Sequence, residues 1–280
     1  MKKIYFIEGL PGSGKTTMVR KLSEYLKSLN KDVVIYNEGD LHPVDLAWIA
    51  ILKKEELDLL INRYPSLEKS IRENIKQFED KLHLAYTKVK LDIKTKDFGD
   101  YCSKYEIYKT EDVNDFIEEH LSLWKVFLEE NKDNDKTFVF ECIFMQNHIN
   151  ELLLKYDMSM KDIIKYYERF QEVLEDIEVL VIYIKHLDID NTLTRITEER
   201  RTNDKSLYKD WIDLVTQYFE ETKYGKVKGY VGYHGALKYF KDRQNIELEV
   251  LDKIKIDKKI VSLDKDYDEV FNEIIKDLKY

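Results

Sequence analysis

The run Gly-Leu-Pro-Gly-Ser-Gly-Lys-Thr at positions 9–16 constrains this chain more than any other feature of its sequence. An apolar stretch rich in β-formers precedes it at 3–8, and apolar residues at helical spacing, among them Met18, Leu22 and Leu29, follow it. These patterns predict a buried strand, a tight loop and an amphipathic helix that begins at Lys15. The N-terminus must therefore begin an α/β unit.

This run matches the P-loop or Walker A pattern G-x-x-x-x-G-K-[ST] in the strand–loop–helix context that the pattern requires. Glycines let the backbone wrap around phosphate oxygens without a Cβ clash, and the helix N-terminus adds positive potential. We expect Lys15 to contact the β- and γ-phosphates of ATP and the Thr16 hydroxyl to bind Mg²⁺. The residues expected to bind the nucleotide are Gly9, Pro11, Gly12, Ser13, Gly14, Lys15, Thr16 and Thr17.

The rest of the chain alternates buried strands with helices. The patterns predict further strands at 32–37, 137–144, 179–185 and 259–263, and helices at 147–156, 159–175, 189–203, 207–222, 235–253 and from Tyr267 onward. The glycine- and lysine-rich segment 223–235 predicts a loop. Because strands occur at both ends of the chain, both ends are expected to contribute to one parallel sheet.

Residues 43–136 separate the second strand from the third and show mainly helical spacing, at 45–62, 67–88 and 111–130. We therefore predict one α/β domain over 1–280, a three-layer P-loop NTPase sandwich. Its five-stranded parallel sheet carries a helical insertion at about 43–136, between strands 2 and 3.

The net charge of −9 and the pI of about 5.4 argue against a protein that binds nucleic acid through a basic face. Cys102 and Cys142 form no CxxC pair, so a zinc site is not expected. The first apolar run is too short for a signal peptide, and no run is long enough to span a bilayer. We expect a cytoplasmic protein without a membrane partner.

In its P-loop and in the order of its elements over most of the chain, the sequence resembles the P-loop small-molecule kinases of the deoxynucleoside kinase and thymidylate kinase-like group. The resemblance implies a five-stranded parallel core and phosphoryl transfer from ATP with Mg²⁺. It also implies an acid at the end of the second or third strand and an arginine-bearing lid after the fourth. In this group the helical insertion builds the acceptor pocket, so we expect the acceptor between the insertion and the P-loop.

The resemblance first concerns the tip of the second strand. In deoxynucleoside kinases this strand ends in a Glu-Pro pair with a Trp shortly after, and the Glu is the general base. Glu38 and Asp40 are both candidates for that role here, with Trp48 downstream, although Pro43 is not adjacent to Glu38. The alternative is a polar turn that closes the strand.

Glu141 ends the third strand in the Walker B position, where it is expected to bind Mg²⁺ together with Thr16, through water, or else to orient the acceptor. Deoxynucleoside kinases typically have Glu-Arg-Ser at this point and thymidylate kinases Asp-Arg, whereas Cys142 and Ile143 follow the acid here. The missing arginine argues against assigning a nucleoside or nucleotide as the acceptor. The alternative is a capped strand end without a metal.

The helix after the fourth strand contains Arg195, Arg200 and Arg201. By analogy with the kinase lid, these residues are expected to stabilise charge on the transferring phosphoryl group, since a guanidinium grips phosphoryl oxygens and stays charged. The alternative is a solvated helix face with i,i+4 ion pairs.

These patterns predict an ATP- and Mg²⁺-dependent phosphotransferase that acts on a small hydroxyl-bearing acceptor: a nucleoside, a nucleotide, another metabolite or an antibiotic. A GTPase-type switch is disfavoured because the Asn-Lys pairs at 30–31 and 131–132 lack the Asp of N-K-x-D. A nucleotide-binding NTPase or a regulatory, partner-binding protein without kinase activity remains the alternative, and a homodimer is also open. The predicted catalytic residues are Lys15, Glu38, Asp40, Arg195, Arg200 and Arg201.

Overall fold

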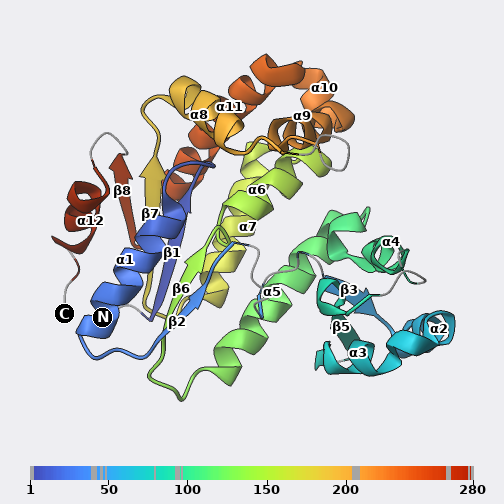
Figure 1. Ribbon diagram of the computed structural model, residues 1–280. Helices are drawn as coiled ribbons and strands as arrows, with labels where there is room; N and C mark the ends of the chain where they lie inside the picture. Colours follow the sequence, from blue (N-terminus) through green and yellow to red (C-terminus); the bar gives the residue numbers. More distant parts are fainter. Residues whose placement is uncertain are drawn as a thin grey trace. The chain divides into compact units, whose positions relative to one another are not determined.

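The computed structural model describes residues 3–38, 43–44, 47, 49–78, 80–91, 95, 97–203, 209–262, 266–276 and 278. The chain forms two compact units. The first unit consists of Met1–Asp40 and Glu129–Tyr280 and contains the P-loop, and the second consists of Leu41–Leu128 (Figure 1).

A five-stranded parallel sheet forms the centre of the first unit. Its strands are β1 (Ile4–Gly9), β2 (Val33–Tyr36), β6 (Thr137–Glu141), β7 (Val179–Lys185) and β8 (Lys258–Ser262), in the order β2-β6-β1-β7-β8. β1 is central and fully buried, and its register places Ile7 beside Glu141 and Gly9 beside Ile184. The predicted fold class is confirmed. In such a sheet, ligands bind outside the carboxyl ends of the strands, which is where the P-loop begins.

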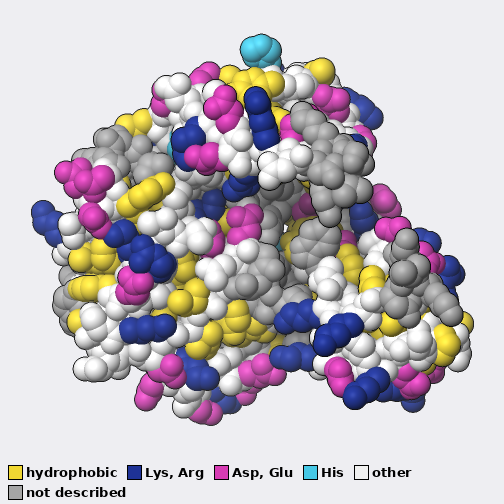
Figure 2. Space-filling model, viewed as in Figure 1, with side chains coloured by type: hydrophobic (Ala, Val, Ile, Leu, Met, Phe, Trp, Pro, Cys, Tyr) yellow, Lys and Arg dark blue, Asp and Glu magenta, His cyan; other side chains and the backbone are white. Residues whose placement is uncertain are grey.

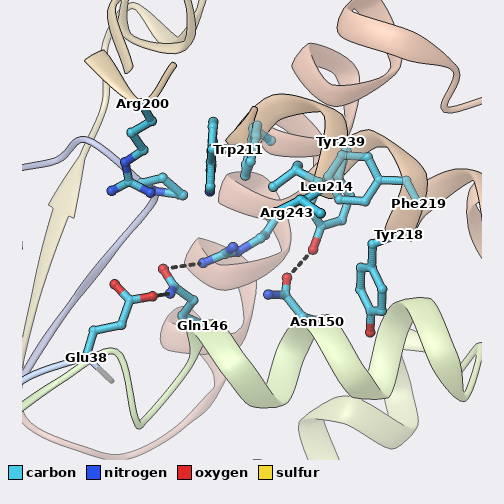
Figure 3. A pocket seen from close by; sticks show the side chains of 13 residues that line it. Glu38, Gln146, Asn150, Arg200, Trp211, Leu214, Tyr218, Phe219, Tyr239 and Arg243 are labelled. Atoms are coloured by element: carbon cyan, nitrogen blue, oxygen red, sulfur yellow. Dashed lines mark hydrogen bonds between the residues drawn. The ribbon is translucent and has the colours of Figure 1, made fainter. Parts of the chain in front are cut away.

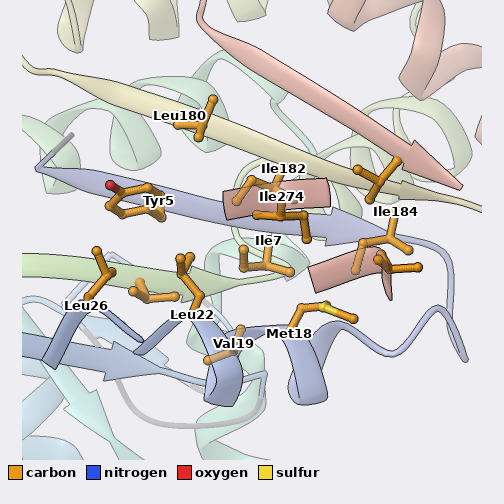
Figure 4. Close-up of a cluster of buried hydrophobic side chains, with 13 residues drawn as sticks. Tyr5, Ile7, Met18, Val19, Leu22, Leu26, Leu180, Ile182, Ile184 and Ile274 are labelled. Atoms are coloured by element: carbon orange, nitrogen blue, oxygen red, sulfur yellow. The ribbon is translucent and has the colours of Figure 1, made fainter. Parts of the chain in front are cut away.

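Helices cover both faces of this sheet. On one face, α1 (Lys15–Ser28) and α12 (Tyr267–Lys276) bury Met18, Leu22 and Ile274 against Ile7 and Ile182 of the strands (Figure 4). Truncating a residue such as Leu22 to Ala is expected to cost about 2–5 kcal/mol.

The opposite face is aromatic. Phe6 of β1 packs on Phe140 and Phe144, and Phe144 packs on Tyr167 and Phe170 of α7 (Met160–Val173). The short helix α6 (Gln146–Asn150) continues into a π-helical turn, Glu151–Lys155. Helices on both faces give the three layers predicted from the sequence.

After β7 the chain forms a helical group: α8 (Ile189–Glu199), α9 (Trp211–Glu221), α10 (Lys223–Lys228) and α11 (Gly232–Lys253). The loop predicted at 223–235 is wrong, because Thr222 caps α10 and left-handed Gly229 ends it. Gly225 lies against α9, where a Cβ would be 2.0 Å from the Phe219 carbonyl oxygen. The glycines here therefore allow two helices to pack closely. Among the residues described, no helix is long and apolar enough to cross a membrane.

The second unit contains a small sheet that the sequence analysis missed. β3 (Ile49–Leu52), β5 (Lys81–Ala85) and β4 (Ile75–Phe78) pair antiparallel in that order, so the helices predicted over all of 45–62 and 67–88 are wrong in part. Ala50, Leu52 and Leu84 share one apolar core. The α-helices of this unit are α2 (Lys54–Arg63), α3 (Glu68–Glu73), α4 (Phe98–Cys102) and α5 (Val113–Glu130), with single 3₁₀ turns at Pro65–Leu67, Tyr86–Lys88, Ser103–Tyr105 and Ile107–Lys109.

Candidate functional site

The P-loop connects β1 to α1 through three glycines with positive φ. The φ angles are 142° at Gly9, 79° at Gly12 and 77° at Gly14. A Cβ at Gly9 would lie 2.5 Å from the carbonyl oxygen of Ile184, and a Cβ at Gly12 would lie 2.5 Å from Cγ2 of Ile196. Only glycine fits this backbone, both by conformation and by space.

The polar groups of the loop fit a polyphosphate. Lys15 is 5% exposed, and its ammonium donates to the carbonyls of Gly9 (2.8 Å) and Leu10 (3.0 Å). The buried Ser13 hydroxyl has no hydrogen-bond partner among the described residues. Gly14 occupies the N-cap of α1 and offers no side chain to the amides of the first turn, in which Thr17 lies. A cation, an unsatisfied hydroxyl and uncapped amides together suit an anion.

The two residues predicted to bind Mg²⁺ lie in contact. The Thr16 hydroxyl donates to Oε1 of Glu141 at 2.7 Å, and Oε2 of Glu141 accepts from the backbone N–H of Glu38 at 3.3 Å. Ligand atoms of Glu38, Glu141 and Cys142 lie within 4.8 Å of one another. Carboxylate and hydroxyl oxygens are the ligands that Mg²⁺ prefers. Burial raises the pKa of the Cys142 thiol well above its usual value, so the sulfur remains neutral.

Glu38, at the tip of β2, is held by two neighbours. Its carboxylate accepts from Nε2 of Gln146 at 2.6 Å and from Sγ of Cys142 at 3.5 Å. Asp40, the other candidate base, and Trp48 lie outside the described residues.

A pocket of about 340 Å³ opens beside the P-loop within the first unit, and none of its described lining residues comes from 43–136, the insertion that was expected to build the acceptor pocket. Glu38, Gln146 and Arg200 lie at one end of it and Tyr218 and Phe219 at the other (Figure 3). A charged end and an aromatic end suit a small amphipathic ligand. The lining residues are Pro11, Glu38, Gln146, Asn150, Arg200, Trp211, Leu214, Val215, Tyr218, Phe219, Tyr239, Phe240 and Arg243.

The three predicted lid arginines have different surroundings. Arg195 donates from Nη2 to the Gly12 carbonyl at 3.1 Å, in the P-loop itself, and from Nη1 to Glu199 at 3.0 Å, which is the i,i+4 ion pair of the alternative interpretation. The Arg200 guanidinium lies 5.0 Å from the ring centroid of Trp211 and lines the pocket. Arg201 is exposed and does not line the pocket. The structure therefore brings Arg195 to the loop and Arg200 to the pocket.

Several pocket residues were not anticipated from the sequence. Trp211 stacks on Phe240 with a ring separation of 6.2 Å, and Arg243 forms a buried ion pair with Glu247 at 2.6 Å. The i,i+4 spacing of Arg243 and Glu247 in a helix with a buried face was the available signal. For Gln146, the only sequence signal was its position shortly after the Walker B acid.

Two buried titratable groups flank this site. Glu8 accepts from the amides of Phe144 (2.7 Å) and Gln146 (3.3 Å), and burial raises its pKa to about 7. His186 follows β7, and its pKa is lowered to about 4, mainly by burial and further by the charges of Lys15 and Arg195. At neutral pH His186 is therefore uncharged.

Comparisons with known proteins agree with a P-loop but identify no family for the whole chain. The model of a family described as chromatin associated protein KTI12 matches residues 4–77, the part that contains the P-loop. No curated protein matches the sequence.

Similar solved structures include a deoxyadenosine kinase from M. mycoides with products dCMP and a flexible dCDP bound. Its TM-score is 0.38 at 12% identity, with 98% of each chain covered. EHV4-TK complexed with TP4A gives a TM-score of 0.35 at 10% identity, covering 99% of this chain and 91% of the other. Structural similarity this low does not show what activity the chain has. The P-loop nucleotide-binding fold is established by the sheet order and the loop geometry.

Proposed function

We propose that this chain is an ATP- and Mg²⁺-dependent phosphotransferase that phosphorylates a small hydroxyl-bearing acceptor. The observation that carries the proposal is that Pro11 of the P-loop and the carboxylate of Glu38 line the same pocket. A general base must lie within hydrogen-bond reach of the acceptor hydroxyl and close to the transferring phosphate.

In this proposal, residues of the first unit have the roles that the reaction needs. The loop amides and Lys15 hold the phosphates of ATP. Thr16 and Glu141, which are in contact, would hold Mg²⁺. When bound, the ion neutralises charge on the β- and γ-phosphate oxygens. Arg195 and Arg200 add positive charge from the loop side and from the pocket side.

The acceptor oxygen forms a bond to the γ-phosphorus while the bond from that phosphorus to the bridging oxygen breaks, so ADP leaves. The acceptor proton passes to the carboxylate of Glu38. Asp40 remains the competing base. Comparing Glu38→Gln with Asp40→Asn decides between them, because loss of the base lowers kcat with little change in KM for ATP.

The test is ADP formation from Mg-ATP across a panel of nucleosides, nucleotides, sugars and aminoglycosides. Turnover that requires an acceptor and disappears in Lys15→Met supports a kinase and names its substrate class. Lys27→Met, on an exposed face of the same helix, is the matched control. ATP binding without acceptor-dependent turnover in the panel would favour a nucleotide-binding or partner-binding protein instead.

A small-molecule acceptor and a cytoplasmic location belong to the same proposal. The net charge is −9, and on the face drawn in Figure 2 Lys and Arg side chains lie among Asp and Glu. Nucleic-acid binding depends on a continuous basic surface, so this charge pattern favours a small ligand over DNA or RNA.

A further inference from the structure

A chain of hydrogen-bonded side chains connects the pocket to the protein interior. Nε2 of Gln146 donates to Glu38 at 2.6 Å, and Oε1 of Gln146 accepts from Nη2 of Arg243 at 3.3 Å (Figure 3). Arg243 then donates from Nε to Glu247 at 2.6 Å, and Glu247 accepts from the hydroxyl of Tyr183. These hydrogen bonds thus link the tip of β2 to Tyr183 of β7 through α6 and α11.

The neighbours of the Gln146 amide fix its orientation. A carboxylate only accepts hydrogen bonds and a guanidinium only donates them. The amide nitrogen must therefore face Glu38, and the amide oxygen must face Arg243. In the flipped orientation the amide oxygen would meet the Glu38 carboxylate, an acceptor, and the amide nitrogen would meet the Arg243 guanidinium, a donor. Gln146 is 6% exposed, so water cannot readily replace either bond.

The buried ion pair of Arg243 and Glu247 contributes little net stability to the fold. Arg243 and Glu247 are 2% and 0% exposed. Burying an ion pair costs hydration free energy that the attraction between the charges barely offsets. Apolar residues of similar size often give the fold equal or greater stability. This pair can instead serve to orient the side-chain amide of Gln146, which accepts from Arg243. The backbone N–H of Gln146 is also held, since it donates to the carboxylate of Glu8 at 3.3 Å.

We propose that Gln146 is a positioning residue that holds the carboxylate of Glu38 toward the acceptor and anchors it to the buried Arg243–Glu247 pair. This inference rests on the proposed function. Glu38 is exposed at a strand tip, so without the amide only the long contact from the Cys142 thiol, at 3.5 Å, holds its carboxylate in the reactive orientation. Misplacing a reacting group by about 1 Å can cost roughly 100-fold in rate.

The test compares Gln146→Met, similar in size but unable to form either bond, with Asn147→Met as a matched control on the next residue of α6. We expect kcat of Gln146→Met to fall about 10- to 100-fold, with KM for ATP within about twofold of the wild type. Thermal unfolding of both variants shows whether the fold is kept. An unchanged kcat in folded Gln146→Met would overturn the proposal.

A double-mutant cycle separates positioning from a merely structural role. If Gln146 acts through Glu38, then Gln146→Met should lower kcat little further in a Glu38→Gln background. Additive losses would contradict the proposal.

A different readout applies if the wild type shows no acceptor-dependent turnover, in which case the proposed function fails. Crystal structures of the wild type and Gln146→Met then decide the positioning. A displaced Glu38 carboxylate in an otherwise unchanged fold supports it, and an unmoved carboxylate overturns it.

Discussion

The hydroxyl of Thr16 donates to the carboxylate of Glu141 over 2.7 Å, although 125 positions separate the two residues in sequence. The parallel register of β1 and β6 brings about this contact, because it places Ile7 beside Glu141 just before the P-loop begins. A helix start and a strand end are thereby joined through a hydrogen bond between two side-chain oxygens.

Glu141→Gln should weaken the use of Mg²⁺ while keeping the fold. The amide oxygen can still accept from Thr16, but the negative charge that attracts a hard cation is lost. We expect the Mg²⁺ concentration for half-maximal turnover to rise at least about tenfold. A Mg²⁺ titration of ADP formation measures this, with exposed Glu175→Gln as the control. An unchanged Mg²⁺ requirement would remove Glu141 from the metal site.

Arg200→Ala should lower kcat much more than Arg201→Ala. Both side chains are exposed, but Arg200 lines the pocket and lies on Trp211, whereas Arg201 is not among the lining residues. Removing a charged group that stabilises a transition state typically costs about 100-fold or more. Steady-state kinetics on the best acceptor of the panel compares the two variants. An equal fall in kcat in both variants would show that lining the pocket gives Arg200 no special role.

The P-loop glycines should differ in their tolerance of alanine. In Gly9→Ala the Cβ meets the backbone of β7 at Ile184, which cannot move aside, so we expect a loss of at least about 3 kcal/mol. In Gly14→Ala it meets the ring of Tyr267, which is 39% exposed and can swing away, leaving a conformational cost of about 1–2 kcal/mol. Gly99→Ala, in a helix with open space, should stabilise by about 0.5–1 kcal/mol. Urea unfolding measures the free energy of unfolding of the three variants. If Gly9→Ala were as stable as Gly14→Ala, the clash with the Ile184 backbone would be contradicted.

Lowering the pH should destabilise the fold through His186. The unfolded imidazole takes up a proton near pH 6.5, but the folded one does so only near pH 4. Between these values the unfolded chain binds the extra proton, so stability falls as the pH falls, by up to about 1.4 kcal/mol per pH unit. His148, with its pKa lowered to about 3 by burial, acts in the same direction. Glu8 acts in the opposite direction, since its raised pKa removes stability as the pH rises from about 4.5 to about 7.

Because these groups oppose one another, the wild-type curve alone does not isolate His186. Unfolding free energies of the wild type and His186→Asn at pH 4.5, 5.5 and 6.5 do so, and the difference between them should shrink as the pH falls. A constant difference across this range would show that His186 is not held neutral.

The sequence was sufficient where structure follows from local pattern. The uninterrupted apolar run of β7 (Val179–Lys185) and the amphipathic start of α12 at Tyr267 were predicted with the bounds that the structure shows. The glycine spacing located the P-loop, and the acid at the end of β6 located its partner. In each case a single segment carries its own signal.

The rest depends on partners distant in sequence. The strands of the second unit are short, and segments such as Lys81–Ala85 (Lys-Leu-His-Leu-Ala) take strand form only because β3 and β4 flank them. The pocket is built from α6, α9 and α11, and no spacing along the chain links Gln146 to Trp211 or Arg243. Its location therefore required the tertiary structure.

The stacking of Arg200 on Trp211 also has an optical consequence. Indole emission responds to a charge near the ring, and this ring lies at the pocket wall with the guanidinium 5.0 Å from its centroid. A ligand that draws Arg200 toward a phosphate would change the light that Trp211 emits. The protein thus contains an intrinsic fluorophore at the pocket, and binding can be followed there in real time without an attached dye.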